Sequence, residues 1–336
     1  MSRIEEGGIS ELAKAIEEDL SKRQNFLNKP SLEAISDITA SVLMTQSVNT
    51  SELSSVLPRE IDDESKYRYI NRNLSNPKVK VSDVMGCYIP EVAHKIYEDE
   101  GMVCLSIDQS IIGNGFEMLM VSMRLGDRAI PVLYKVVETK GSIGFAIQKQ
   151  LLDEVYELMP KDISIMLLGD RFYGTSSLVS WCQGHGWHYR LRLKGNLIFD
   201  KEGWVVSVGK MAETGVRNLE GFCFNKTDVK TNIGVMHDKG HKEPWIIAMD
   251  ATPTREATME YKKRWSIESM FSDLKSRGFN IGETKLEDAG RIERMLMILS
   301  IALLWAVSTG MALMVKNPPK TKSKKNYSAP SNLSSN

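Results

Sequence analysis

Cysteine is scarce in this sequence, with four residues in a chain of 336. The four are too few and too scattered for the disulfide framework that stabilises small secreted proteins. They are Cys87, Cys104, Cys182 and Cys223. A secretory leader is also missing, because no basic segment followed by an apolar one opens the chain. We therefore expect a protein of the reducing cytoplasm.

A zinc-binding pattern is missing as well. The candidate ligands contain no CxxC pair and fall into two groups that are far apart in the sequence, so a zinc site is not expected. These residues are Cys182, His185, His188, His237 and His241.

An excess of charge of either sign is likewise absent, since 43 basic side chains balance 43 acidic ones. Overall charge therefore cannot attract nucleic acid, and any DNA-binding surface must be a local patch. With 42% hydrophobic and 26% charged residues, the chain has the composition of an ordinary globular protein. Its length is sufficient for two or three domains.

Residues 1–100 are expected to be helical, because apolar residues recur there with helical spacing. The clearest segments are 9–20, 32–43 and 65–74. Basic side chains alternate with tyrosines and asparagines between residues 62 and 81, a composition that suits contacts with DNA phosphates and groove edges. The basic residues are Lys66, Arg68, Arg72, Lys78 and Lys80, and the tyrosines are Tyr67 and Tyr69. A solvated helical surface is the alternative interpretation.

Strand patterns begin at residue 103. Three segments with alternating apolar residues, at 103–108, 116–123 and 129–137, predict an antiparallel meander with short turns. A helix at 144–159, a buried strand at 163–170, a helix at 175–183 and a strand at 188–194 follow. Asp108 and Asp170 each end an apolar strand of this βββαβαβ order. Alone, each aspartate is more simply interpreted as a turn or cap residue.

The segment Tyr261–Lys275 is predicted to form an amphipathic helix with a polar working face. At about 100° per residue, four polar side chains fall within an arc of about 60°. They are Tyr261, Arg264, Glu268 and Lys275. Glu268 could hold a metal ion while Arg264 and Lys275 bind phosphate oxygens. An ordinary amphipathic helix with i,i+4 ion pairs is the alternative.

The spacing of these four residues resembles the signature of bacterial insertion-sequence transposases of the DDE type. In that signature two residues separate the tyrosine from the arginine, three separate the arginine from the glutamate, and six separate the glutamate from the lysine. The family is the one named after insertion sequence four, and all four positions and all three intervals match. The similarity extends over residues 103–308 and includes RIERMLMILSIALLWAV. The sequence DRFYG at 170–174 resembles the second-aspartate motif of the family. The first motif departs slightly, because Ser110 stands two places after Asp108 where threonine is frequent.

The resemblance implies an α/β fold with a ribonuclease H-like catalytic core, in which helices flank a mixed sheet. In this fold the first strand lies beside the fourth, which brings Asp108 and Asp170 together, and Glu268 becomes the third catalytic carboxylate. The expected parts are an N-terminal helical domain that binds DNA ends at 1–100, the core at 101–195 and 246–315, a β-rich insertion at 196–245, and a disordered tail at 316–336.

Three converging carboxylates repel one another unless cations neutralise them, so Asp108, Asp170 and Glu268 are expected to be metal ligands. The implied cofactor is a pair of Mg²⁺ ions, for which Mn²⁺ could substitute. The implied activity is cleavage at the ends of an insertion sequence and strand transfer into target DNA. The partners would be the terminal inverted repeats, target DNA and a second copy of the chain in a homodimer, in the bacterial cytoplasm at the nucleoid and away from membranes.

Further DNA contacts are expected around the insertion. Strand alternation places Arg190, Arg192 and Lys194 on one face, where they could follow a DNA backbone; exposed strand polarity is the alternative. In similar transposases a tryptophan at the start of a strand like 243–250 stacks on a flipped base, which suggests this role for Trp245. A core tryptophan is the alternative.

The segment Met295–Val315 carries no charge over 21 residues and meets the length rule for a membrane span. Its position after the Glu268 helix favours a core helix that covers the sheet, and a membrane-anchored protein is the alternative. Similar proteins often continue beyond their final helix. A truncated, inactive copy that only binds DNA is therefore a second alternative.

Overall fold

The computed structural model describes residues 2–24, 26–215, 217–237 and 243–316. The helices are α1 (Ser2–Arg23), α2 (Lys29–Thr45), α3 (Thr50–Val56), α4 (Asp63–Leu74), α5 (Val81–Gly86), α6 (Ile89–Glu100), α7 (Phe145–Leu158), α8 (Ser176–Gly184), α9 (Val208–Glu213), α10 (Arg255–Met259), α11 (Trp265–Leu274) and α12 (Ala289–Lys316), with 3-10 turns η1 (Glu260–Arg264) and η2 (Ile281–Glu283). The strands are β1 (Val103–Gly113), β2 (Phe116–Leu125), β3 (Arg128–Glu138), β4 (Ile165–Gly169), β5 (His188–Arg192), β6 (Ile198–Lys201), β7 (Trp204–Ser207), β8 (Asn218–Phe224), β9 (Lys230–Met236) and β10 (Trp245–Met249).

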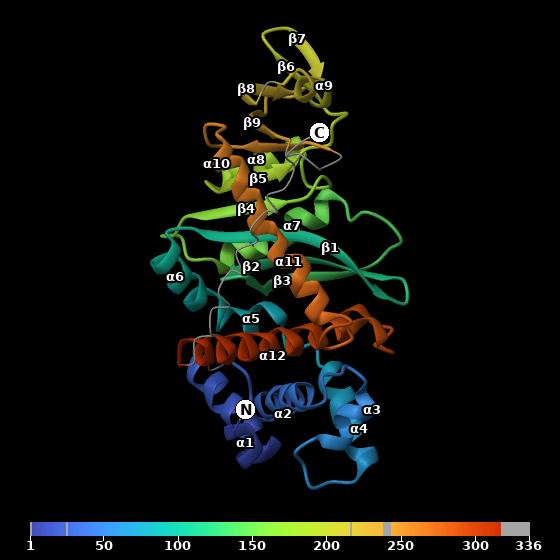
Figure 1. Cartoon of the computed structure of the whole chain (residues 1–336). Coiled ribbons are helices and arrows are strands. Elements are labelled where there is room, and N and C mark those ends of the chain that lie inside the picture. The colour runs from blue at the N-terminus through green and yellow to red at the C-terminus, as the bar shows by residue number, and fades with distance from the viewer. Residues whose placement is uncertain (1, 25, 216, 238–242, 317–336) are drawn as a thin grey trace, which may run out of the picture.

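The strands form one mixed sheet in the order β3-β2-β1-β4-β5-β10-β9-β8-β6-β7 (Figure 1). β1, β2 and β3 pair antiparallel, so the predicted meander is confirmed. β4 pairs parallel with both β1 and β5, which confirms that the first strand lies beside the fourth. The fold is thus a mixed α/β structure with a large sheet and helices packed against it.

Burial along β1 marks the place where the core ends. Val103–Ile107 are buried on both faces, and the chain becomes partly exposed from Asp108 onward. Helices α6 and α11 pack against this strand, and α11 crosses in front of the sheet (Figure 1). A strand that is apolar on both faces and then turns polar delivers its first polar side chains to the rim of the core. Asp108 is the first of these residues.

The segment expected to be a β-rich insertion extends the central sheet. Antiparallel pairing joins β9 to β8, β8 to β6 and β6 to the edge strand β7, and β9 pairs with β10. β10 in turn pairs antiparallel with β5, where the parallel part of the sheet ends. The insertion therefore lies at the far end of the same sheet, beyond the strands that carry the aspartates (Figure 1).

Helices α1 to α4 pack together, and α12 lies between them and the sheet, whereas α5 and α6 lie on the sheet side of α12 (Figure 1). α1, α2 and α4 contain the three helical segments expected from the sequence. α12 contacts both α2 and β3, so it joins the helical region to the sheet. The apolar run that the sequence placed after the Glu268 helix is this joining element.

Helix α12 has two different halves. By length and composition, Ala289–Leu313 could cross a membrane, but half of its apolar window is buried inside the protein. Met295–Leu304 are buried, whereas Met311 and Leu313 are exposed. The first half of α12 is therefore the core helix expected from the sequence. That the core helix extends to Val315 stays a prediction. The tail expected to be disordered falls, apart from Lys316, outside the described residues.

Candidate active site

The sequence predicts one continuous α-helix over Tyr261–Lys275, and this prediction is wrong. The first residues of the segment belong to the 3-10 turn η1, and Lys275 lies just beyond α11 with φ −98° and ψ −130°. Because a 3-10 helix has about three residues per turn, Tyr261 and Arg264 still share a face. That face points inward: both side chains are buried, whereas the side chain of Glu268 is 55% exposed. The predicted polar face is therefore buried at its start and open at its middle.

Strand register brings the two aspartates together. Ile107 of β1 pairs with Gly169 of β4, and Asp108 and Asp170 are the next residues on these neighbouring parallel strands. Adjacent strands lie about 4.8 Å apart, so two carboxyl groups at this register interact. Asp170 accepts a hydrogen bond from the backbone N–H of Phe172 at 2.8 Å, and Asp108 accepts one from Gln109 at 2.9 Å. These bonds fix the direction in which each carboxylate points.

Arg264 connects Asp108 to Glu268. Its Nη1 donates to Oδ2 of Asp108 at 3.1 Å, and its Nη2 donates to Oε1 of Glu268. The Nε of Arg264 is buried and has no hydrogen-bond partner in the described part of the chain. A single guanidinium thus draws residues of β1 and α11 together across 156 positions of sequence. It also supplies positive charge to a cluster of carboxylates.

The electrostatics of Asp108 show how crowded this cluster is. Burial and the neighbouring Asp170 carboxylate raise the pKa of Asp108 to about 6, although the charge of Arg264 acts in the opposite direction. The Glu268 carboxylate contributes a smaller upward shift. The site therefore holds more negative charge than its surroundings stabilise.

The donor set fits a divalent cation. Carboxylate oxygens are the ligands that Mg²⁺ and Mn²⁺ prefer, and a cation would relieve the repulsion that raises the Asp108 pKa. Among the described residues, no group of three or more His, Cys, Asp or Glu side chains is close enough to hold a metal ion as placed. The guanidinium of Arg264 stands between Asp108 and Glu268 instead. A metal ion held by all three would need Arg264 to turn toward another anion.

Lys275 lies at the other end of the site. Its Nζ donates to the hydroxyl of Ser110 at 2.6 Å, which joins the end of α11 to β1 two residues beyond Asp108. Burial lowers the pKa of Lys275. The hydroxyl at position 110, noted in the sequence as a substitute for threonine, therefore orients this lysine.

The segment 170–174 adds one residue that the sequence did not single out. Tyr173 is buried and its hydroxyl has no hydrogen-bond partner among the described residues. Burial, followed by the charges of Asp108 and Asp170, raises the pKa of Tyr173. Only glycine is tolerated at position 174, because a Cβ there would lie 2.1 Å from the carbonyl oxygen of Arg192. This close approach presses the loop against β5 and holds the tyrosine beside the carboxylates.

The prediction that Arg190 contacts DNA is wrong. Arg190 is buried and donates to the carboxylates of Asp250 at 2.9 Å and Glu260 at 2.7 Å. It also donates to the carbonyl oxygen of Ala257, so its guanidinium ties β5 to α10 and η1. Strand alternation correctly placed this residue on one face, but the fold covers that face.

The other two residues of the expected basic strand have different surroundings. Arg192 lies 3.6 Å from Glu243, and Lys194, beyond the end of β5, has its Nζ 4.7 Å from the centroid of the exposed Phe172 ring. Phe172 stands two residues after Asp170, so Lys194 lies near the candidate site. These two residues stay candidates for contact with a DNA backbone.

Trp245 and Tyr261 belong to a small apolar cluster. Trp245 is 9% exposed and packs edge-on against Tyr261, with ring centroids 5.2 Å apart. Trp265, at 46% exposure, meets the same indole edge-on at 5.7 Å. The structure therefore favours the core interpretation of Trp245. Tyr261 is equally enclosed, so its ring supports Arg264, whose guanidinium carbon lies 5.7 Å from the ring centroid.

Replacing Trp245 with alanine should destabilise the protein by about 3–5 kcal/mol, because a buried indole leaves a cavity. Nicking and strand transfer should then fall together. Thermal unfolding and both activities would be measured for Trp245→Ala and for the control Trp265→Ala, whose exposed ring leaves a smaller cavity. A variant at 245 with unchanged stability but selectively impaired strand transfer would restore the base-stacking hypothesis.

The Asp108 pKa has a consequence for the metal-free protein. The pKa is about 6 in the folded state and 3.8 in an ordinary aspartate, so folding favours the protonated form. Above pH 6 the charged group destabilises the protein by at most about 3 kcal/mol, and this penalty disappears as the pH falls from 6 toward 4. Asp108→Asn should therefore unfold at a higher temperature than the parent at pH 8 in chelator, and the gap should shrink to about half by pH 5 and close only near pH 4. A gap that does not depend on pH would contradict this assignment.

A comparison with protein families agrees with the character of this site. Residues 145–305 match the family model of the transposase DDE domain. The match includes Asp170 and Glu268 and begins after Asp108. It supports a DDE transposase. No curated protein matches the sequence.

Two solved structures are similar to the chain at low sequence identity. One is endonuclease V of Ciona intestinalis in complex with DNA, with 14% identity, 63% of this chain and 87% of that chain covered, and a TM-score of 0.28. The other is Argonaute of Marinitoga piezophila in complex with guide RNA and target DNA, with 13% identity, 73% and 37% coverage, and a TM-score of 0.26.

Proposed function

We propose that this protein is a metal-dependent DNA transposase of the insertion sequence four family with a ribonuclease H-like core. The observation that carries the proposal is the acidic cluster itself. Asp108 and Asp170 are adjacent by strand register, and Arg264 holds Glu268 beside Asp108. The family match over residues 145–305 supports the same conclusion.

Asp108, Asp170 and Glu268 would hold the two Mg²⁺ ions, or Mn²⁺ in their place. When bound there, such ions activate water and then the freed 3′-hydroxyl as nucleophiles and stabilise the leaving oxygen. The protein supplies the fixed carboxylates, whose directions are set by backbone N–H donors on β1 and after β4. No covalent intermediate with the protein is required.

Arg264 and Lys275 would position phosphates of the cleaved strand. Arg264 has a planar fork of donors, of which Nε has no partner among the described residues. The guanidinium can exchange a carboxylate for a phosphate without losing charge-assisted hydrogen bonds. Lys275 sits on the other side, oriented by Ser110. Arg192 and Lys194 would extend the phosphate contacts along the adjacent loop.

The DNA partners would be the terminal inverted repeats of the element and a target duplex. The N-terminal helices would bind the element end, two copies of the chain would form the synaptic complex, and the protein would act at the nucleoid in the bacterial cytoplasm. The competing proposal is a copy that binds DNA without cleaving it.

Nicking of a labelled duplex that carries the terminal repeat separates these two proposals. We expect a 3′-hydroxyl product with Mg²⁺ or Mn²⁺, and none in excess chelator, while DNA binding persists in both conditions. Binding without any product at any metal concentration would favour the inactive copy. Product that forms in excess chelator would refute the metal-dependent mechanism.

A further inference from the structure

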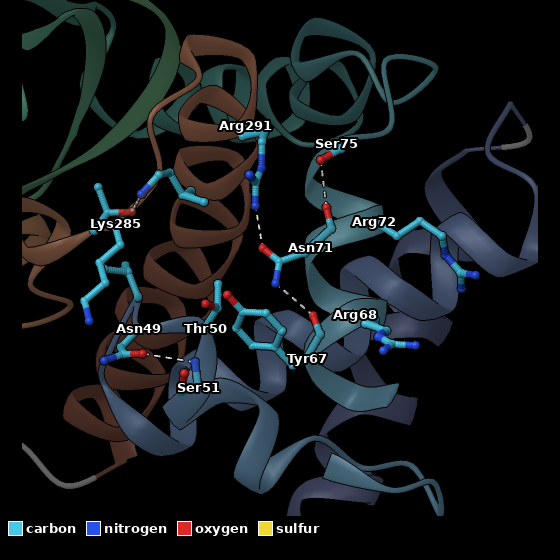
Figure 2. Close-up of a pocket in the computed structure, with 13 residues that line it drawn as sticks. Asn49, Thr50, Ser51, Tyr67, Arg68, Asn71, Arg72, Ser75, Lys285 and Arg291 are labelled. Carbon is cyan, nitrogen blue, oxygen red and sulfur yellow. Dashed lines mark hydrogen bonds between the residues drawn. The ribbon is translucent and has the colours of Figure 1, made fainter. Parts of the chain in front are cut away.

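A polar cavity of about 590 Å³ lies between the N-terminal helices and the start of α12 (Figure 2). Its walls come from the start of α3, from α4, and from the segment 284–291. Four cationic side chains line it, and no carboxylate does. They are Arg68, Arg72, Lys285 and Arg291. The cavity therefore favours an anionic occupant.

Arg291 supplies a donor that is already in place. Its Nη2 donates to the side-chain oxygen of Asn71, which fixes the guanidinium against α4. Its Nε is buried and has no hydrogen-bond partner among the described residues. A buried donor without a partner is costly, and an anion that accepts from it would remove that cost. Lys285 is exposed and forms no ion pair within the part of the chain that the structure describes.

The positive charges are spread too widely for one small anion. Figure 2 shows Lys285 on one side of the cavity near Asn49, and Tyr67 between them and α4, while Arg68 and Arg72 extend from the opposite side of α4. Arg68 and Arg72 are one helical turn apart, so their Cβ atoms lie about 6 Å from each other. Among the residues that the structure describes, Arg68 is the only one of the four cations with a carboxylate partner, the exposed Glu64. A chain of phosphates fits this distribution better than a single phosphate does.

The cavity is also connected to the candidate active site. The chain leaves α11 at Lys275, passes through η2 and reaches the cavity at Thr284. Along this path the β1–β2 turn is attached to it, because Asn114 donates to the carbonyl oxygen of Thr284 at 3.2 Å. A DNA strand bound in the cavity would thus lie against the segment that follows Lys275. The connection gives a DNA duplex two places of contact joined by one short segment of the chain.

We propose that this cavity binds the phosphodiester backbone of the element's DNA, with Lys285 and Arg291 on one side of α4 and Arg68 and Arg72 on the other. It is a second DNA contact that sets the position of the duplex relative to Asp108. The inference rests on the proposed function and adds to it a specific phosphate-binding site shared by the helical region and the segment that follows the catalytic helix. Tyr67, 43% exposed at the rim, offers a hydroxyl to the sugar-phosphate chain.

The test uses the full chain carrying Asp108→Asn, so that DNA is bound and not cut. Affinity for a labelled terminal-repeat duplex is measured by fluorescence anisotropy at several salt concentrations without metal. Lys285→Gln and the pair Arg68→Gln with Arg72→Gln are compared with Lys14→Gln, which removes one exposed lysine from α1 outside the cavity. Thermal unfolding of each variant is measured to check that it is folded.

We expect each cavity variant to bind about 3–10-fold more weakly near 0.1 M salt, and the slope of log affinity against log salt to become shallower by about one per lost phosphate contact. The loss should be the same on a duplex of unrelated sequence, because phosphate contacts do not depend on sequence. Lys14→Gln should match the parent in both affinity and slope.

Other outcomes overturn the inference in distinguishable ways. Unchanged affinity and slope in the cavity variants, with strong binding by the parent, would refute the cavity site and leave the transposase proposal intact. Binding of inorganic pyrophosphate that Lys285→Gln abolishes, with DNA affinity unaffected, would assign the cavity to a free phosphate compound. A parent protein that binds no DNA would refute both proposals.

Discussion

Replacing any one of Asp108, Asp170 and Glu268 with its amide is expected to lower DNA cleavage by about 10³-fold or more, as for other residues that act as a unit. Each amide removes a ligand charge and nearly preserves the shape of the side chain. Binding of the terminal-repeat duplex should survive, because phosphate contacts from basic residues provide that affinity. The measurement is Mg²⁺-dependent nicking by Asp108→Asn, Asp170→Asn and Glu268→Gln.

The double variants should be scarcely worse than the single ones, since removing one member of a cooperating set already disables the others. Asp273→Asn is the matched control, because Asp273 is another carboxylate of α11 and only pairs with Arg128 at 3.0 Å on the surface. Near-normal cleavage by one of the three amide variants would remove that residue from the set. Cleavage losses that multiply in the double variants would contradict a single shared site.

Arg190→Ala should be the most destabilising single change to a charged residue in this part of the sheet. It leaves the partly buried carboxylates of Asp250 and Glu260 without their shared partner, and losing these charge-assisted hydrogen bonds costs about 2–3 kcal/mol. Arg190→Lys should be intermediate, because lysine keeps the charge but cannot donate to both carboxylates as a planar fork. Chemical denaturation of the metal-free protein would measure the free energy of unfolding.

Arg192→Ala is the comparison for this experiment. Arg192 lies on the same strand and is 3.6 Å from the exposed Glu243, so its loss should change stability by less than about 1 kcal/mol. When only folded protein is compared, Arg192→Ala should weaken DNA binding more than Arg190→Ala does. If Arg190→Ala were as stable as the parent and bound DNA more weakly, the DNA-facing role first predicted for this arginine would have to be restored.

Much of this architecture follows from local sequence patterns. The apolar alternation of the segments 103–108, 116–123 and 129–137 predicted the meander, and the continuous apolar run before Asp170 predicted a strand buried on both faces. These patterns are local, since side chains along a strand alternate with a period of two residues. The spacing from Tyr261 to Lys275 likewise singled out Glu268 and Arg264, which the structure places beside Asp108.

Other features could not be obtained from periodicity. A strand pattern shows which side chains share a face but not whether another element covers that face, so Arg190 was expected in contact with DNA and is instead enclosed by α10 and η1. The same limit applies to Trp245 and Tyr261, which pack against each other across 16 residues of sequence. The 3-10 turn at Glu260–Arg264 was also unexpected, because helical spacing over so few residues fits either kind of helix.

The sequence by itself determined most of the elements and singled out the candidate residues of the site: two aspartates that end apolar strands, and a glutamate grouped with an arginine and a lysine. Only the tertiary structure decided how these groups meet, because the contacts are long-range. Asp108 reaches Arg264 across 156 residues and Ser110 reaches Lys275 across 165. The cavity between α4 and α12 arises in the same way, since Asn71 and Arg291 are 220 residues apart, and side chains so distant in sequence share no local pattern.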